Sequence, residues 1–246
     1  MEKRYAFLVS LLVVVVVAGN WLFFNSNEIF PEREIVIISR VIDGDTLELK
    51  DGRIVRLLNI NTPERGKFWY DKATNFLRQY EGESVGLELE GKGKYGRDLG
   101  RIYYNKNYVN LKIVEEGYGH VYIFGNKEIG VFKKAEDIAR EDELGIWEKS
   151  EYYDCLEVEI NKYDEYVVVK DSCEVNFKGW TIKDESTKDF KFSSSEFSYF
   201  TLYSGEGVSK NEVLYWGRSE VWDDERDSVF IRDSDGLLVY YDSYGY

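Results

Sequence analysis

Residues that could bind a metal ion and cut a phosphate ester gather between Arg40 and Glu64. Asp43 and Asp45 lie two positions apart in an alternating apolar and polar run, so we expect their side chains on the same face of one strand. The dipeptide Asp51-Gly52 then predicts a tight hairpin turn. The segment therefore reads as a β-hairpin that carries its carboxylates at one end.

The return strand of this hairpin adds the other polar groups. It spans residues 53–60 and carries one cation that can face inward, Arg56. It ends in Asn61-Thr62-Pro63-Glu64, where Pro63 keeps Thr62 extended and restricts the next bend. Carboxylates, an amide oxygen and a guanidinium are thus expected at one end of a small sheet. This combination predicts a hard-cation site beside a phosphate clamp.

Phosphodiester hydrolysis needs a poised water and neutralisation of the charge on phosphorus. The Asp45 carboxylate, the Asn61 side-chain oxygen and the Thr62 backbone carbonyl are oxygen ligands of the type that Ca²⁺ prefers. Asp43 stands close enough to add a compensating charge from outside the ligand set. Glu64, just past the proline, can take a proton from the water. The sequence thus predicts a calcium site with a neighbouring general base.

Two arginines and two tyrosines complete the predicted site. Arg56 can bind phosphate oxygens through two parallel hydrogen bonds, a bidentate geometry that lysine cannot provide. Arg97, presented by Tyr95-Gly96-Arg97, can stabilise the charge that develops in the transition state. Tyr95 and Tyr122 are candidates for substrate binding by stacking or hydroxyl contact. For Tyr122, packing in the core is an equally good explanation.

Four motifs occur in a fixed order: VIDGDT, an arginine on the next strand, TPE, and KYGR. In this order they resemble the staphylococcal (thermonuclease-type) nuclease domain, and the resemblance covers about residues 34–149. It implies Ca²⁺-dependent hydrolysis of DNA and RNA with little sequence preference, and it assigns the same roles to Arg56, Glu64 and Arg97. The family usually has a second metal-binding aspartate where this chain has Asn61. Loss of that charge is expected to weaken calcium binding roughly ten- to a hundredfold.

Each of these residues also has an ordinary explanation when taken singly. An Asp-Gly-Asp sequence is most often a turn, Arg56 could be a surface arginine, and Glu64 could be a helix N-terminal charge. His120, the one histidine, is expected to be structural rather than catalytic. The alternative to an enzyme is a non-catalytic module that binds nucleic acid or the cell envelope through a weakened metal site. Retention of Arg56, Glu64 and Arg97 together argues against it.

The surrounding pattern predicts the elements that position these residues. After the hairpin strands, helical periodicity appears three times and β-type alternation twice more. Short strands with helices after the third and fifth predict a five-stranded barrel of the oligonucleotide-binding (OB) type, which is also the fold that the resemblance implies. The expected helices are 68–79, 108–116 and 131–144, and the further strands are 84–90 and 99–104, joined by a loop at 91–97.

The C-terminal part, residues 152–246, has a different sequence pattern, in which short segments of β-type alternation are separated by frequent turn residues. This pattern predicts an immunoglobulin-like antiparallel β-sandwich. Segments such as GWTIKD and DSVFIRDSDGLLVYYDSY resemble the lamin-tail domain, whose partner here is unknown. From residue 150 onward there are 10 basic and 22 acidic residues, so this part cannot bind nucleic acid by phosphate attraction. We expect a passive spacer or tether whose removal leaves hydrolysis nearly intact.

The N-terminus reads as a leader. Lys3 and Arg4 precede an apolar stretch from Ala6 to Phe24 that is about 28 Å long as a helix. Residues 1–26 are therefore expected to be a signal peptide or an uncleaved membrane anchor, with the folded domains extracellular. Cys155 and Cys173 suit that compartment and could form one disulfide.

Overall fold

The computed structural model describes residues 33–123, 127–193 and 197–246. The predicted leader lies outside these residues. Within the described part of the chain, no helix is both long enough and apolar enough to span a membrane.

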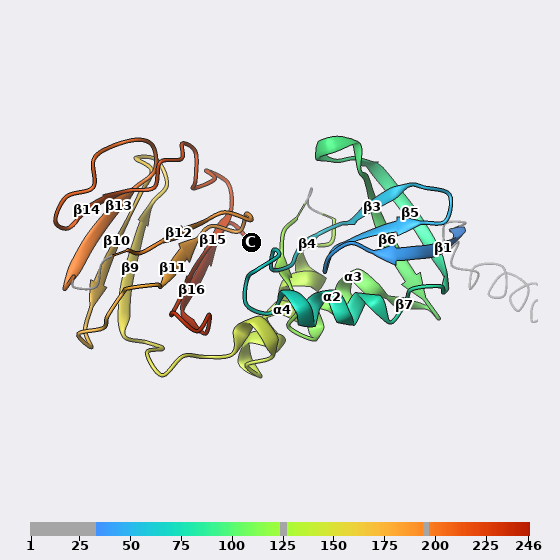
Figure 1. Cartoon of the computed structure of the whole chain (residues 1–246), viewed down its shortest axis with the longest axis horizontal. Coiled ribbons are helices and arrows are strands. Elements are labelled where there is room, and N and C mark those ends of the chain that lie inside the picture. Colours follow the sequence, from blue (N-terminus) through green and yellow to red (C-terminus); the bar gives the residue numbers. More distant parts are fainter. Residues whose placement is uncertain (1–32, 124–126, 194–196) are drawn as a thin grey trace, which may run out of the picture. The chain divides into compact units, whose positions relative to one another are not determined.

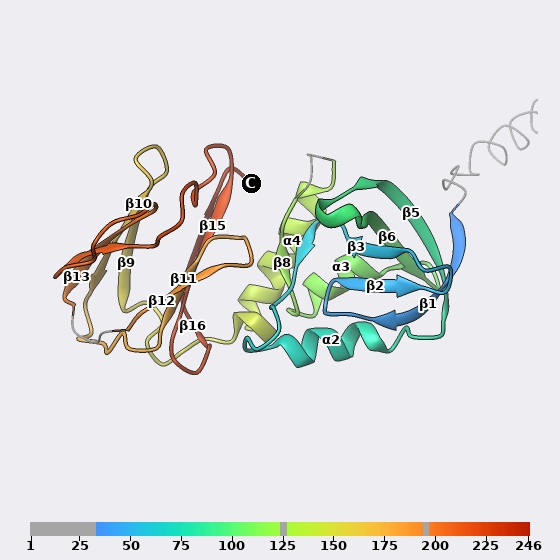
Figure 2. The ribbon, with the colours of Figure 1, turned by 45° about the horizontal axis from the view of Figure 1, so that its top comes forward.

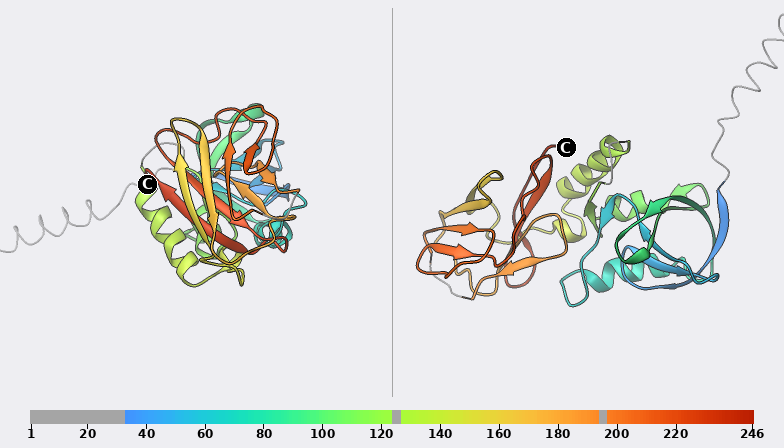
Figure 3. Two further views of the ribbon diagram at one scale, coloured as in Figure 1. Left: turned by 90° about the vertical axis from the view of Figure 1, so that its left-hand side faces the viewer. Right: turned by 90° about the horizontal axis from the view of Figure 1, so that it is seen from above.

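Five strands close into a barrel (Figure 1), as the sequence predicted. Their order is β3-β2-β1-β5-β6, and parallel pairing of β3 with β6 closes the ring, whose curvature is visible in the right-hand view of Figure 3. Alternate side chains fill the interior because successive residues of a strand point to opposite faces. The strands are β1 (Glu34–Val41), β2 (Thr46–Leu49), β3 (Ile54–Leu57), β5 (Ser84–Lys92) and β6 (Asp98–Tyr104).

Three short strands extend this framework. β7 (Asn107–Tyr108) continues the sheet beside β6, and β4 (Ile60–Asn61) pairs with β8 (His120–Val121). The β4–β8 pair places Asn61 opposite His120. The pairing thereby fixes β4, which directly follows β3 and the predicted hairpin, at the edge of the barrel.

The three predicted helices form, each within a few residues of its expected bounds. They are α2 (Tyr70–Arg78), α3 (Val109–Glu115) and α4 (Ile129–Glu141), with short 3₁₀ turns η1 (Lys94–Gly96) and η2 (Gly145–Trp147). Figure 2 shows α2 running along the barrel beside β1 and β2. The apolar faces of the helices bury residues such as Leu77, Ile113 and Phe132, each 0% exposed, in the barrel's core.

The structure corrects one detail of the hairpin. Asp43 and Asp45 do not lie on a strand but in the bend between β1 and β2, where the Asp45 backbone N–H donates to Asp43 Oδ1 at 3.1 Å. Gly44 between them packs tightly, since a Cβ there would lie 2.6 Å from Thr62 Oγ1. Because aspartate favours such local side-chain to backbone bonds, the bend wins over a continued strand.

Residues from Leu156 onward form a sandwich of two four-stranded sheets, β14-β13-β10-β9 and β12-β11-β15-β16. Side chains of both sheets meet in one core, for example Val167 and Phe200 with Ile182 and Val229, all 0% exposed. The pairing of β13 with β14 is parallel, a departure from the antiparallel expectation. The strands are β9 (Leu156–Asn161), β10 (Tyr166–Asp171), β11 (Thr181–Lys183), β12 (Asp189–Lys191), β13 (Tyr199–Tyr203), β14 (Val213–Tyr215), β15 (Asp227–Arg232) and β16 (Leu238–Tyr244).

Barrel and sandwich share a third hydrophobic cluster. Ile146 and Trp147 follow α4 of the barrel, and they pack with Phe230 and Leu238 of the sandwich; all four are at most 2% exposed. Within the sandwich, Cys155 and Cys173 form a disulfide with a Cα–Cα distance of 5.4 Å.

Candidate active site

Asp45 is the centre of a buried polar network at the end of the hairpin. Its Oδ2 accepts hydrogen bonds from the Thr62 backbone N–H (3.0 Å) and the Thr62 hydroxyl (3.1 Å). Its Oδ1 accepts one from the Thr46 hydroxyl at 3.0 Å. Because Asp45 is only 5% exposed, these bonds replace the water that a carboxylate would otherwise require. The β1–β2 bend and the segment after β4 are thus tied together.

Arg56 lies on β3 and reaches the same network. Its Nη1 is 3.1 Å from Asp45 Oδ2 and donates to the Leu57 carbonyl at 3.0 Å, while Nη2 donates to Asn61 Oδ1 at 3.1 Å. The guanidinium is therefore held in one orientation by a carboxylate, a backbone oxygen and an amide oxygen. A planar group fixed in this way is prepared to bind the oxygens of a phosphate.

Asp43 stands beside this network with a different protonation behaviour. Burial and the negative charge of Asp45 raise the pKa of Asp43 to about 6. Two neighbouring carboxylates repel each other when both are ionised. A nearby cation would relieve this repulsion, and the prediction that Asp43 adds a compensating negative charge beside such a cation stays a prediction.

Glu64 differs from these groups because it is exposed. It follows Pro63 and lines a cavity of about 350 Å³ together with Asn61 and Thr62. Its backbone carbonyl accepts from the Lys67 N–H at 2.9 Å, which forms a turn before α2. Among the described residues no group donates to its carboxylate, so the carboxylate is open to solvent and to a substrate-bound water.

Arg97 and Tyr95 lie on the loop between β5 and β6. Tyr95 is 94% exposed with φ of 62°, and the Arg97 guanidinium lies 5.8 Å from its ring centroid. Parallel pairing of β3 with β6 aligns Arg56 with Leu99, so Arg97 enters the sheet two residues before the partner of Arg56.

Tyr122 and His120 lie on the β8 side. Burial and the negative charge of Glu185 raise the pKa of Tyr122, and the positive charge of Arg56 acts in the opposite direction. His120 is buried, and burial together with the Lys183 ammonium holds its pKa well below the usual value. Its Nε2 lies 3.2 Å from the Lys183 ammonium and its Nδ1 lies 3.0 Å from the Val121 carbonyl. The ring is therefore neutral, accepts at Nε2 and donates at Nδ1, which is a structural role.

Proteins of similar sequence identify the family to which this chain belongs. Residues 54–149 match the family described as "Staphylococcal nuclease homologue". A thermonuclease of Staphylococcus intermedius is 30% identical over 161 residues, which cover 57% of this chain and 96% of that protein. The chain belongs to the family of staphylococcal nuclease homologues. An uncharacterized endonuclease of Escherichia coli O157:H7 is 31% identical over 115 residues (45% of this chain, 74% of that protein), and endonuclease YhcR of Bacillus subtilis is 28% identical over 139 residues (47% and 11%).

The staphylococcal nuclease fold implies a bound metal ion, and the donor set here can be tested against it. Asp45, Asn61 and Thr62 offer a carboxylate, an amide oxygen and a backbone carbonyl, and the Asp45 carboxylate and the Asn61 oxygen belong to one hydrogen-bonded network with Arg56. Oxygen ligands of mixed charge suit Ca²⁺, which tolerates several water ligands. No cluster of three acidic, histidine or cysteine side chains occurs among the residues that the structure describes. The donors present are of the oxygen type that a hard cation prefers, and Asp45 is the one charged group among the three.

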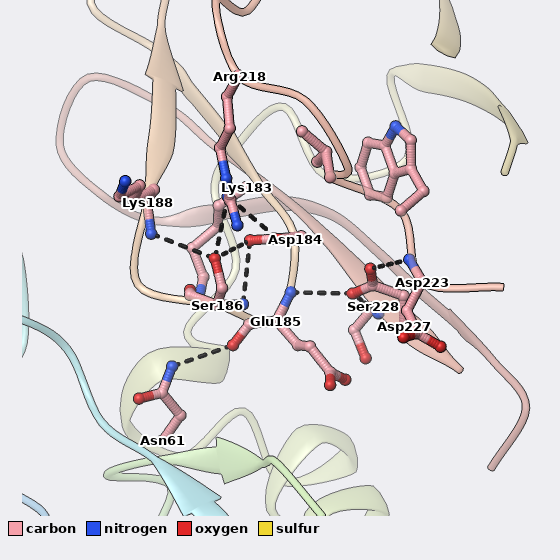
Figure 4. A network of polar contacts seen from close by, with 12 residues as sticks. Asn61, Lys183, Asp184, Glu185, Ser186, Lys188, Arg218, Asp223, Asp227 and Ser228 are labelled. Atoms are coloured by element: carbon pink, nitrogen blue, oxygen red, sulfur yellow. Dashed lines mark hydrogen bonds and ion pairs between the residues drawn. The ribbon is translucent and has the colours of Figure 1, made fainter. Parts of the chain in front are cut away.

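Contacts from the sandwich are the part of the site that the sequence did not predict. The Asn61 amide donates to the Glu185 backbone carbonyl at 3.0 Å (Figure 4). The Lys67 ammonium lies 2.7 Å from both carboxylate oxygens of Asp189. Asp189 is 122 residues away from Lys67 in the chain, and no local motif connects them. The opposite charges of Lys67 and Asp189 are the only feature of the sequence that could have suggested their contact.

Proposed function

We propose that this nuclease homologue is an exported Ca²⁺-dependent endonuclease that hydrolyses DNA and RNA with low sequence specificity. The observation that carries the proposal is the network in which Asp45, Arg56, Asn61 and Thr62 are joined by hydrogen bonds within 3.1 Å. Similarity to a thermonuclease and to endonucleases supports the substrate class. None of the helices in the described part of the chain resembles a groove-reading helix, so recognition would rely on phosphate and on stacked bases.

In this proposal the chain's own residues divide the work. Asp45, Asn61 and Thr62 would hold the ion, which polarises the phosphate and lowers the pKa of bound water when present. Glu64 accepts the proton of the attacking water, since its carboxylate is exposed and borders the cavity. Arg56 orients the phosphate oxygens. Arg97 supplies positive charge from the β5–β6 loop as the pentavalent phosphorus forms.

Export and the identity of the C-terminal domain are further parts of the proposal. The basic and apolar N-terminal sequence supports export. The disulfide between Cys155 and Cys173 supports it too, because such bonds persist mainly outside the cytosol. Two packed four-stranded sheets are compatible with assignment of residues 152–246 to the lamin-tail family.

A calcium-titrated digestion of single-stranded DNA tests the activity. We expect degradation with added Ca²⁺ and none in chelator. Glu64→Gln should lower kcat by about 10²- to 10⁴-fold, because general-base assistance is lost, while substrate binding is nearly unchanged. Equal activity with and without calcium would reject the metal mechanism, and a Glu64→Gln enzyme as fast as the wild type would reject the general base.

A further inference from the structure

The segment 61–69, here called the catalytic loop, runs from the last residue of β4 to the residue before α2 and carries Asn61, Thr62 and Glu64. Side chains of its second half face away from the barrel: Phe68 is 50% exposed, and residues 64–67 are all exposed. Its internal backbone bonds are few, namely Lys67 N–H to the Glu64 carbonyl at 2.9 Å and Tyr70 N–H to the Lys67 carbonyl at 3.3 Å. The barrel therefore fixes the start of the loop through Asn61 and Thr62, but few backbone bonds hold residues 64–68.

The sandwich touches this loop at three successive points. At its start, the Asn61 amide donates to the Glu185 carbonyl at 3.0 Å. In its middle, the Lys67 ammonium bonds both oxygens of Asp189 at 2.7 Å. Near its end, Phe68 lies against Gly236, where an added Cβ would be 2.5 Å from the Phe68 Cβ.

The last residue of the loop is held by the shared core. Trp69 has a left-handed backbone with φ of 68°, a conformation that side-chain-bearing residues rarely adopt without support. Its ring packs against the cluster that contains Phe230 and Leu238 of the sandwich. The strained backbone is thus accompanied by packing of the ring against a cluster to which barrel and sandwich both contribute.

The cavity beside Glu64 has walls from both modules. The catalytic loop lines it with Glu64, Lys67 and Phe68, and the sandwich lines it with residues that include Thr181, Lys191 and Ser234. A change in the position of the sandwich would therefore alter the space in which the Glu64 carboxylate works.

We propose that the β-sandwich is a positioning element of the nuclease site: Asp189 through Lys67, together with the Glu185 carbonyl and Gly236, holds the catalytic loop so that Glu64 faces the scissile phosphate. This inference rests on the proposed nuclease function. Displacement of a catalytic group by about 1 Å can cost up to roughly 10²-fold in rate, so weak contacts at the loop can have large effects on turnover. The same contacts could instead let the sandwich cover the site and inhibit it. Glu64 is exposed, which argues against such a cover.

Charge reversal tests the proposal on the full-length protein. Lys67→Asp and Asp189→Lys each break the pair, and we expect each to lower kcat about tenfold with KM within about twofold. KM should hold because Arg56, Arg97 and Tyr95 lie outside the loop. The double variant restores the pair in reverse and should recover kcat to within about twofold of the wild type. Lys72→Asp is the matched control, since Lys72 is an exposed cation on α2 with no side-chain partner among the described residues.

The outcomes separate this inference from the function on which it rests. A wild type that cuts no nucleic acid at any calcium concentration would remove the proposed function itself. An active wild type whose single variants keep full kcat would overturn the positioning role, as would a double variant without rescue. A rise of kcat in the single variants would show that the sandwich covers the site instead. Thermal unfolding of every variant, measured in parallel, excludes loss of folded protein as the cause.

Discussion

At the scale of single residues, Asn61 has two functions that an aspartate cannot combine. Its oxygen accepts from Arg56 and its nitrogen donates to the Glu185 carbonyl, at 3.1 and 3.0 Å. A carboxylate at this position would add a charge to the metal site but would place an oxygen against the Glu185 oxygen. The amide thus links the barrel to the sandwich at the expense of charge on the proposed metal site.

Asn61→Asp should separate these two effects. We expect the calcium concentration for half-maximal activity to fall about tenfold, because a charged ligand replaces a neutral one. The apo protein should also lose about 1 kcal/mol of unfolding free energy, since the amide hydrogen bond is broken. Calcium-titrated hydrolysis measures the first effect and urea unfolding in chelator measures the second.

A matched variant controls for the added charge alone. Asn75→Asp makes the same chemical change on the exposed face of α2 and should leave the calcium requirement as it is. If Asn61→Asp also leaves that requirement unchanged, the Asn61 oxygen is not a metal ligand.

Residues close in sequence were the predictable part of the site. Asp45, Arg56, Asn61 and Thr62 belong to one hairpin and its exit, so short-range pairing suffices to bring them together. The bend at Asp43 was mistaken for strand because alternation of apolar and polar residues does not reveal a side chain that bonds its own backbone. Contacts between modules carry no such local signal.

At the scale of elements, β11 presents a half-buried cation to the barrel. Lys183 donates to the Ser186 carbonyl at 2.7 Å and contacts neutral His120, and Figure 4 shows its place beside Asp184 and Glu185. Burial lowers the pKa of Lys183 to about 8, and the positive charge of Arg232 acts in the same direction. Lys183, which contacts β8 through His120, therefore has a lowered pKa.

This lysine predicts a particular pH dependence of stability. Between pH 8 and the ordinary lysine pKa of 10.5 the unfolded chain binds more protons at this site than the folded one, so the contribution of Lys183 to stability rises with pH. Relative to Lys183→Met, the wild type should gain roughly 2–3 kcal/mol of unfolding free energy between pH 7 and pH 10.5. Urea unfolding of both proteins across this range measures the difference.

The comparison of the two proteins cancels the titration of tyrosines elsewhere. A constant difference between wild type and Lys183→Met across pH 7 to 10.5 would mean that Lys183 keeps an ordinary pKa, and hence that it is not buried against His120 in solution.

At the scale of the whole molecule, the shared cluster bears on whether residues 35–246 unfold as one cooperative unit. Trp147 and Phe230 have ring centroids 5.8 Å apart and are at most 1% exposed. Removal of residues 150–246 would expose Trp147, Ile146 and Ala139 to water, so we expect the truncated protein to be less stable; survival of hydrolysis after truncation stays a prediction. The strand pattern predicted both modules, but it could not show that an aromatic of β15 completes the core after α4.

Neighbouring residues of β15 allow this coupling to be tested, because they point to opposite faces. Phe230 packs in the shared cluster, whereas Val229 lies in the sandwich's own core, and both are at most 1% exposed. Calorimetry of the wild type should show one transition. Phe230→Ala should cost about 3–5 kcal/mol and split it into two, because the contact between modules is lost while each keeps its own core. Val229→Ala should lower the midpoint and keep a single transition, because coupling through Phe230 and Trp147 persists; two transitions in the wild type would instead mean that the modules fold independently.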